Sequence, residues 1–188
     1  KGLHFPNVTL VGIISADTCL YLPDFRANER TFQLISQVAG RAGRSAKSGA
    51  VLIQTFLPDQ PAIRFALDND FDRFAAEECT HRKNCNLPPF WRLAAIVMRD
   101  NDFDRLDAAS KNMRKTIDHV IGSRRLNAIV RGPIPPVISR IQRSHRLQII
   151  IRTPDAAVMH RLFEALRAER PVRPAVKVAI DIDPVNLL

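Results

Sequence analysis

Arg92-Leu-Ala-Ala-Ile-Val-Met-Arg99 is an unbroken run of six apolar residues between two arginines. Its length and its β-branched residues predict a buried β-strand. Apolar residues then recur at helical spacing and predict an amphipathic helix from about 103 to 121, with a buried stripe of Leu106, Ala109, Met113, Ile117 and Val120. This strand and helix open a structural unit that begins near residue 89.

The segment after this helix repeats the pattern. Short apolar runs predict strands at 127–131, 146–152 and 176–182, and a second periodic stretch predicts a helix at 155–167. The resulting order, β-α-β-β-α-β, is that of the ferredoxin-like arrangement, in which two crossover units share one antiparallel sheet. Residues 89–188 are therefore predicted to form a ferredoxin-like domain.

The first part of the chain predicts a different fold class. Val8-Thr-Leu-Val-Gly-Ile-Ile-Ser15 is almost wholly apolar, which is typical of a parallel strand covered on both faces. A helix at 29–43, with Asn28 as its N-cap, leads to a second strand at 50–56. Strand, helix and strand form a right-handed crossover unit, so this part is predicted to be α/β with a parallel sheet.

Prolines mark the boundary between the two parts. Helices predicted at 61–68 and 71–83 precede Leu87-Pro-Pro-Phe90, where consecutive prolines halt regular structure. The chain is therefore predicted to contain two modules, residues 1–88 and residues 89–188.

The two modules differ in charge. The whole chain carries 28 Lys and Arg against 19 Asp and Glu, a net charge of +9. Residues 1–88 hold 10 basic and 9 acidic residues, whereas residues 89–188 hold 18 and 10. A basic second module predicts contact with phosphates or with an acidic peptide. Positive charge that only keeps the domain soluble is the alternative.

The composition also argues against several kinds of site. No apolar run reaches the roughly 20 residues that cross a bilayer, so no membrane partner is expected. Cys19, Cys79 and Cys85 fit neither a disulfide framework nor a zinc motif, and no metal site is predicted in this chain. A reducing cytoplasm is the expected compartment.

The strongest functional motif is Gln37-Val-Ala-Gly-Arg-Ala-Gly-Arg44. Gln37, Arg41 and Arg44 have the spacing i, i+4 and i+7, which places them on one face of a helix. Two guanidiniums on one stripe suit a polyphosphate. Each glycine costs about 1 kcal/mol relative to alanine inside a helix, which predicts that a ligand or another backbone approaches closely. A solvated basic helix end is the alternative.

A second basic cluster surrounds the entrance to the predicted strand at 146–152. We predict that Arg140, Arg143, Arg146 and Gln148 contact DNA or a partner protein, because Arg and Gln donors suit either. The alternative is a solvated edge strand whose charges block aggregation.

Several segments together resemble one protein family. They are Lys1-Gly-Leu-His-Phe-Pro6, Asp24-Phe-Arg26, Gln37–Arg44, Leu87-Pro-Pro-Phe90 and Asp181-Ile-Asp-Pro184. In combination they resemble the PriA family of bacterial replication-restart helicases, also called primosomal protein N′. The resemblance implies that 1–88 is the C-terminal part of the second RecA-like helicase lobe, with linker helices, and that 89–188 is the family's C-terminal DNA- and partner-binding domain.

The resemblance also implies roles for residues of the first strand region. Lys1 and Gly2 match helicase motif V, which links the ATP state to the DNA track. Asp17 lies in the continuation of that motif. DNA contact is thereby implied for Lys1, and nucleotide contact for Gly2 and Asp17.

The Gln37–Arg44 segment matches helicase motif VI. In related helicases the arginines of this motif reach the γ-phosphate of ATP. The match implies catalytic roles for Gln37, Arg41 and Arg44, with nucleotide contacts from Gly40 and both arginines. Arginines placed in this way typically raise the rate of phosphoryl transfer by about 10³ to 10⁵.

Parts of a complete helicase are missing from the sequence. It has no Gly-x-x-x-x-Gly-Lys-Ser/Thr loop, no acidic Mg²⁺-binding strand motif and none of the family's zinc-binding cysteine cluster. Because the chain starts at Lys1 rather than Met, we expect it to be a piece of a longer protein that completes the ATP–Mg²⁺ site and holds zinc. Alone, the chain is expected to have negligible ATPase activity.

The function that the resemblance implies is that of an ATP-dependent 3′-5′ DNA helicase. Such an enzyme recognises stalled or branched forks and restarts replication by primosome assembly, in the bacterial cytoplasm at the nucleoid. Its implied partners are forked DNA, the tail of single-stranded DNA-binding protein and other primosome proteins. His145 and Leu147 stand where the family often has aromatics, which favours backbone electrostatics over base stacking. A non-catalytic binding module and a RecG-like helicase are the alternatives.

Overall fold

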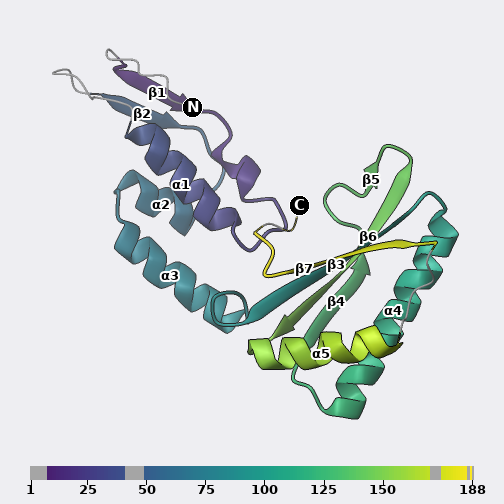
Figure 1. Ribbon diagram of the computed structural model, residues 1–188. Helices are drawn as coiled ribbons and strands as arrows, with labels where there is room; N and C mark the ends of the chain where they lie inside the picture. The colour runs from purple at the N-terminus through teal and green to yellow at the C-terminus, as the bar shows by residue number, and fades with distance from the viewer. Residues whose placement is uncertain (1–7, 41–48, 170–174, 186, 188) are drawn as a thin grey trace. The chain divides into compact units, whose positions relative to one another are not determined.

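The computed structural model describes residues 8–40, 49–169, 175–185 and 187 (Figure 1). The chain divides into two compact units, Lys1–His81 and Arg82–Leu188. The division falls near the end of helix α3 (Phe71–Asn84), a few residues before the proline-rich segment at which the sequence placed it.

The first unit contains a parallel strand pair. Strand β1 (Leu10–Ile13) pairs in parallel with β2 (Ala50–Ile53), and helix α1 (Ala27–Ala39) lies between them in the sequence. A short 3₁₀ helix (Ala16–Cys19) follows β1, and helices α2 (Pro61–Leu67) and α3 follow β2. This arrangement confirms the predicted α/β class.

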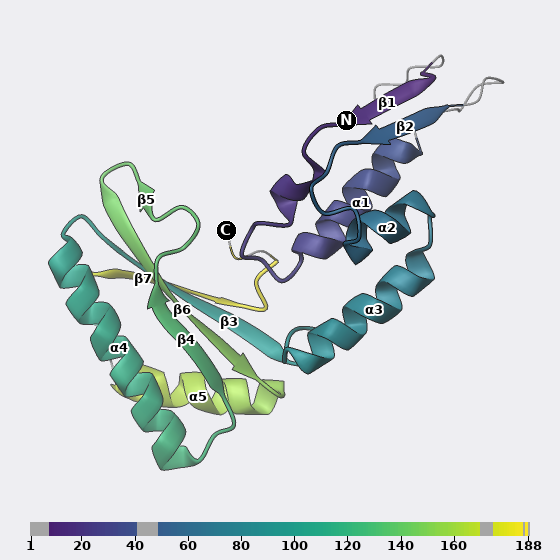
Figure 2. The ribbon, with the colours of Figure 1, turned by 180° about the vertical axis from the view of Figure 1, so that it is seen from behind.

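Aromatic packing holds this unit together. Phe32 of α1 stacks on Phe74 of α3 with ring centroids 4.3 Å apart. The helices cover one face of the strand pair (Figure 2). On the other face Leu10 and Leu52 are 64% and 68% exposed. The prediction that both strand faces are covered is therefore wrong for the described residues, because α1 and α2 pack on one side only.

The start of α1 also differs from its prediction. The helix begins at Ala27, so Asn28 lies inside the first turn, and its side-chain amide donates to Glu78 Oε2 at 3.1 Å. The Asp24 carboxylate accepts the backbone N–H of Arg26 at 2.9 Å. The prediction of Asn28 as N-cap is wrong because the helix begins earlier in the chain.

The second unit is one antiparallel sheet with two helices. Its elements are β3 (Arg92–Asp100), α4 (Phe103–Arg124), β4 (Ile129–Ile134), β5 (Arg140–Ile141), β6 (Ser144–Thr153), α5 (Ala156–Glu169) and β7 (Lys177–Ile182). The strand order is β4-β6-β3-β7, with β5 paired to the start of β6. Every pairing in this sheet is antiparallel, which confirms the predicted ferredoxin-like arrangement.

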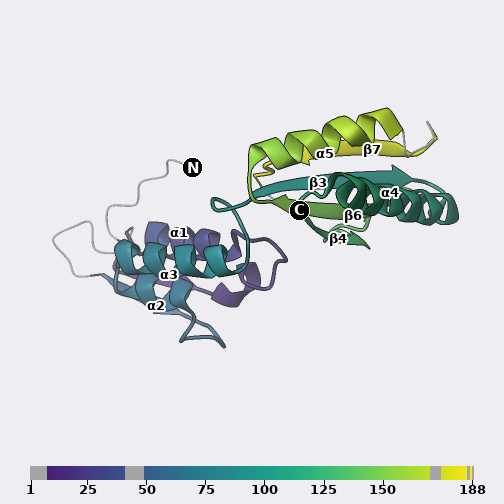
Figure 3. The same ribbon diagram turned by 90° about the horizontal axis from the view of Figure 1, so that it is seen from below.

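Both helices pack on the same face of this sheet (Figure 3). Alternate residues of the two central strands point into the core between sheet and helices: Ala94, Ile96, Met98, Leu147, Ile149 and Ile151. The remaining residues of the same strands point to the other face, which neither α4 nor α5 covers. We call this second surface the open face.

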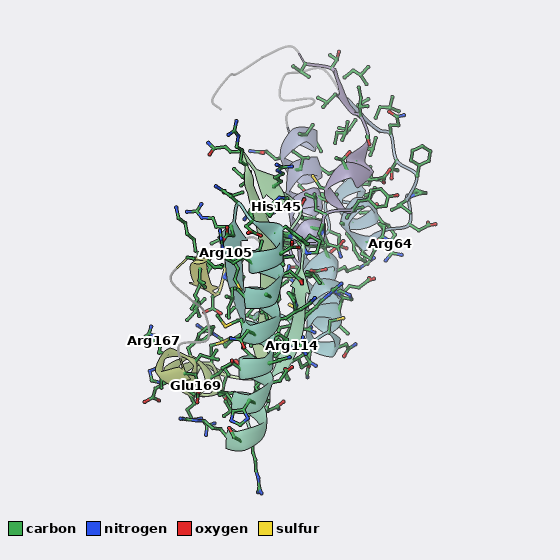
Figure 4. The ribbon with its side chains drawn as sticks, turned by 90° about the vertical axis from the view of Figure 1, so that its right-hand side faces the viewer. Arg64, Arg105, Arg114, His145, Arg167 and Glu169 are labelled. Carbon is green, nitrogen blue, oxygen red and sulfur yellow. The ribbon has the colours of Figure 1, made fainter. Side chains whose placement is uncertain are left out.

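A bulge in strand β4 brings two backbones close together. The register between β4 and β6 shifts between Arg131 and Ile134. Gly132 in this bulge has φ +105°, and a Cβ atom there would lie 2.5 Å from the backbone oxygen of Gln148. Arg114 extends from α4 (Figure 4). Its Nη1 donates to Gly132 O at 2.5 Å. The bulge therefore needs a residue without a side chain.

Candidate functional site

The described part of the motif VI match lies at the end of α1. The sequence predicted a helix to residue 43, but α1 ends at Ala39, and Gly40 is its C-cap. Of the predicted stripe, Gln37 lies on α1. A Cβ at Gly40 would lie 3.4 Å from Ser36 O, an ordinary contact. Gly40 thus stands at the helix end, where its low helix propensity is harmless.

Four predicted site residues fall outside the described residues. They are Lys1, Gly2, Arg41 and Arg44. Their assignment to motifs V and VI rests on the sequence, and their roles stay predictions.

Asp17 is held at the carboxyl end of the parallel strand pair. The residue is 2% exposed and follows β1 in the 3₁₀ helix. Its Oδ1 accepts a hydrogen bond from the Thr55 hydroxyl, and its Oδ2 accepts from the Phe56 backbone N–H at 2.8 Å. The Thr55 hydroxyl, and after it the Phe56 N–H, lower the pKa of Asp17. The ionised carboxylate therefore ties the end of β1 to the loop after β2, and its nucleotide contact stays a prediction.

The structure divides the second predicted cluster between two sides of a hairpin. Arg140 pairs with His145 across the β5–β6 hairpin, and Arg143 lies in its turn. Arg146 and Gln148 lie on β6 in the alternate positions and so share the open face. The structure brings Arg146 and Gln148 together and places Arg140 on the opposite side of the hairpin.

A groove of about 460 Å³ lies on the open face. Its floor is made of small apolar side chains of β3 and β7, namely Ala95, Val97 and Ala179. Arg146 and Gln148 line it from β6, and the hairpin residues Ile141 and Ser144 line it from the side. The groove is thus built entirely within the second unit.

Two basic groove residues, Arg99 and Lys177, were not predicted as site residues from the sequence. Arg99 on β3 pairs directly with Arg146 on β6 and with Lys177 on β7. We call Arg99, Arg146 and Lys177 the basic row. No sequence signal joins them, because they are separated by dozens of residues and only the strand register makes them neighbours.

An ion pair fixes the corner where β3 meets α4. Asp100 is 7% exposed and accepts hydrogen bonds from Arg105 Nε at 2.8 Å and from the Asp102 N–H at 2.9 Å. Arg105, and then the Asp102 N–H, hold the pKa of Asp100 far below its ordinary value of 3.8. His145 lies at the same end of α4 (Figure 4), where its ring meets Phe103 edge-on at 5.5 Å. This corner stabilises the unit and does not enter the groove.

We expect the Asp100–Arg105 pair to make the second unit acid-sensitive. A carboxyl whose pKa is depressed by folding contributes stability above its unfolded pKa, and this contribution is lost as pH falls toward the folded value. The contribution of Asp100 to the free energy of unfolding therefore decreases as the pH falls below 3.8, the ordinary pKa of its carboxyl. The variant Asp100→Asn should be less stable near neutral pH but should lose less stability than the parent between about pH 5 and about pH 2. Urea midpoints at several pH values test this, and parallel pH curves would contradict it.

Within residues 8–40, 49–169, 175–185 and 187, no three His, Cys, Asp or Glu side chains gather as a metal site. No helix in the described ranges is both long and apolar enough to cross a membrane.

Fold and surface together define a class of domain: a ferredoxin-like sheet with helices on one face and a basic groove on the other. A family model described as the primosomal protein N C-terminal domain matches residues 83–185. The chain belongs to this family. The match confirms the resemblance that the sequence motifs indicated.

Curated relatives match along the whole chain. A replication restart protein PriA of Bacillus subtilis (strain 168) is 34% identical over 100% of this chain and 23% of its own length. The protein of that name from Treponema pallidum is 40% identical over 100% of this chain and 28% of its own length. One from Chlamydia muridarum is 57% identical over 52% of this chain. The chain thus spans about a quarter of the relatives that it matches throughout.

Proposed function

We propose that this chain is the C-terminal part of an ATP-dependent 3′-5′ DNA helicase that recognises stalled or branched replication forks and restarts replication by primosome assembly. The observation that carries the proposal is the match of relatives named replication restart protein PriA along the whole chain. The family match to residues 83–185 and the parallel strand pair of the first unit support it.

In this proposal the first unit supplies half of an ATP site. The motif begins at Gln37, which lies on α1. Arg41 and Arg44 stabilise the negative charge that develops on the transferred phosphoryl group. A phosphate-binding loop, the Mg²⁺ ligands and the zinc ligands belong to other parts of the proposed enzyme. Closure of two lobes on ATP then couples hydrolysis to movement along DNA.

The second unit contacts DNA and partner proteins in the proposed enzyme. Residues 89–188 hold 18 basic and 10 acidic residues, and the groove gathers Arg99, Arg146 and Lys177 on one face. Such a surface attracts the phosphates of forked DNA or the acidic tail of single-stranded DNA-binding protein. The proposed enzyme also contacts other primosome proteins and acts at the bacterial nucleoid.

A salt titration of the 188-residue chain on forked DNA tests the DNA contact. Neutralising phosphates releases counterions, so the binding constant should fall as salt rises, with a log–log slope of about −0.9 for each phosphate on duplex arms. Fluorescence anisotropy with a labelled fork measures this slope. Affinity that does not change with salt would contradict phosphate contact by this chain.

A second candidate function is a binding module without a catalytic role. The observation that favours it is that the ferredoxin-like unit has its own core and its own groove. The two functions differ in what the Gln37–Arg44 segment does, and the arginine variants described in the Discussion separate them. The family match leaves the RecG-like alternative without support.

A further inference from the structure

The basic row is an unusual feature for three neighbouring strands of a sheet. Arg146, Arg99 and Lys177 lie directly opposite one another on three neighbouring strands. Like charges in directly opposed cross-strand positions destabilise a sheet. Among the described residues, neither Arg99 nor Lys177 has an ion-pair partner. Arg146 is oriented by a hydrogen bond from Nη1 to Ile138 O at 3.0 Å. An anion over the row would remove this repulsion.

The floor next to the row offers an apolar surface and one amide. Gln148 pairs with Val97, and Val97 pairs with Ala179, which forms a second row across the same strands. Gln148 is only 7% exposed, and no described residue makes a hydrogen bond to its side chain. A carboxamide offers two donors and one acceptor oxygen. A ligand in the groove would therefore find both a flat apolar floor and a buried hydrogen-bonding group.

The groove changes character along its length. The row containing Gln148 lies two residues from the basic row, about 7 Å along the strands. Asp181 lines the far end, two residues further on, in the row of Ala95. From one end to the other, the groove presents three cations, then an apolar floor with one amide, then a carboxylate.

We propose that this groove binds single-stranded DNA, with one phosphate on the basic row and one base on the apolar floor beside Gln148. The choice of DNA rests on the proposed function. The groove has the size for a nucleotide, and a base within a duplex cannot lie flat on the floor. A peptide with several carboxylates would place negative charge against Asp181, whereas a neutral base brings an N–H donor to it.

The composition of the groove sets the kind of binding. None of the described residues that line it is aromatic, so stacking contributes little and the phosphate contact dominates. The binding is therefore weak, depends strongly on salt, and is selective for strands whose bases are unpaired. At a fork, the groove therefore binds a single-stranded arm in preference to the duplex arms.

The double variant Arg99→Ala, Lys177→Ala in the 188-residue chain tests the proposal. Its affinity for a fluorescein-labelled oligothymidylate should be about tenfold weaker, with a log–log salt slope shallower by about 0.7 for each lost phosphate contact. The matched control is Lys115→Ala, Arg161→Ala, which removes the same charge from exposed positions on α4 and α5. This control should bind as the parent does.

A second variant separates the base from the phosphate. Gln148→Met keeps the side-chain volume but removes the amide, so it should weaken binding while leaving the salt slope unchanged. Circular dichroism and urea midpoints check that each variant is folded.

Three outcomes would overturn the proposal. They are unchanged oligothymidylate binding by Arg99→Ala, Lys177→Ala; equal losses for this variant and its control; and a larger loss on a blunt duplex or an acidic peptide than on the single strand. If the parent chain still binds forked DNA in these cases, the proposed function stands and only this site assignment fails. If the parent chain binds neither forks nor single strands, its proposed DNA contact fails as well.

Discussion

In the proposed full-length helicase, the double variant Arg41→Ala, Arg44→Ala is expected to hydrolyse ATP at least about a thousandfold more slowly than the parent, with DNA binding retained. Negative charge builds on the transferred phosphoryl group and on the leaving oxygen, and a guanidinium in a site that excludes water stabilises it. DNA binding relies on other residues and should persist. Steady-state ATPase and fork binding, measured on the same preparation, give the two readouts.

The control for this experiment removes two arginines from the same unit. Arg64 (Figure 4) and Arg73 form exposed ion pairs with Glu77 and Asp70 at 3.3 and 3.1 Å. Such pairs contribute little to stability, so Arg64→Ala, Arg73→Ala should leave the ATPase unchanged.

Lysine at the two motif positions gives an intermediate test. Arg41→Lys, Arg44→Lys keeps the charge but loses the planar fork of donors, and it should recover only part of the rate. The isolated 188-residue chain should show negligible turnover. An unchanged ATPase in the alanine variant would refute the catalytic assignment and favour the binding-module function.

The variant Gly132→Ala is expected to lower the free energy of unfolding by about 3 kcal/mol. Gly132 has φ +105°, and its new Cβ would lie 2.5 Å from Gln148 O and 3.3 Å from the Ile149 Cα. These are backbone atoms of a central strand, so the clash cannot be relieved by a side-chain rotation. The bulge must open, and the hydrogen bond from Arg114 to Gly132 O is strained with it.

Gly122 provides the matched control for this substitution. It lies near the end of α4, has no positive φ, and a Cβ there would meet nothing within 4 Å. Gly122→Ala should be neutral or stabilising by up to about 1 kcal/mol, because alanine has the higher helix propensity. Urea unfolding of both variants measures the contrast. A Gly132→Ala midpoint equal to that of the parent would show that the β4 bulge relaxes freely.

Local pattern sufficed for the order of elements in the second unit. The run Leu93–Met98 predicted β3, and the periodic stripe from Leu106 to Val120 predicted α4. Burial of these elements produces a pattern of apolar residues that is visible in the local sequence. β5 has only two residues, which are too few to show a hydrophobic pattern, so this strand was not predicted. The end of α1 was placed too late because apolar spacing continued beyond Gly40.

The sequence by itself determined the family and the β-α-β-β-α-β order of the second unit, because motifs and hydrophobic periods are properties of neighbouring residues. Only the tertiary structure decided which side chains share a surface. Antiparallel register placed Arg99 between Arg146 and Lys177, and alternation along the hairpin removed Arg140 from their side. Register is a long-range property: a shift of one residue moves every side chain of a strand to the opposite face. The groove on the open face could therefore not be predicted from the sequence alone.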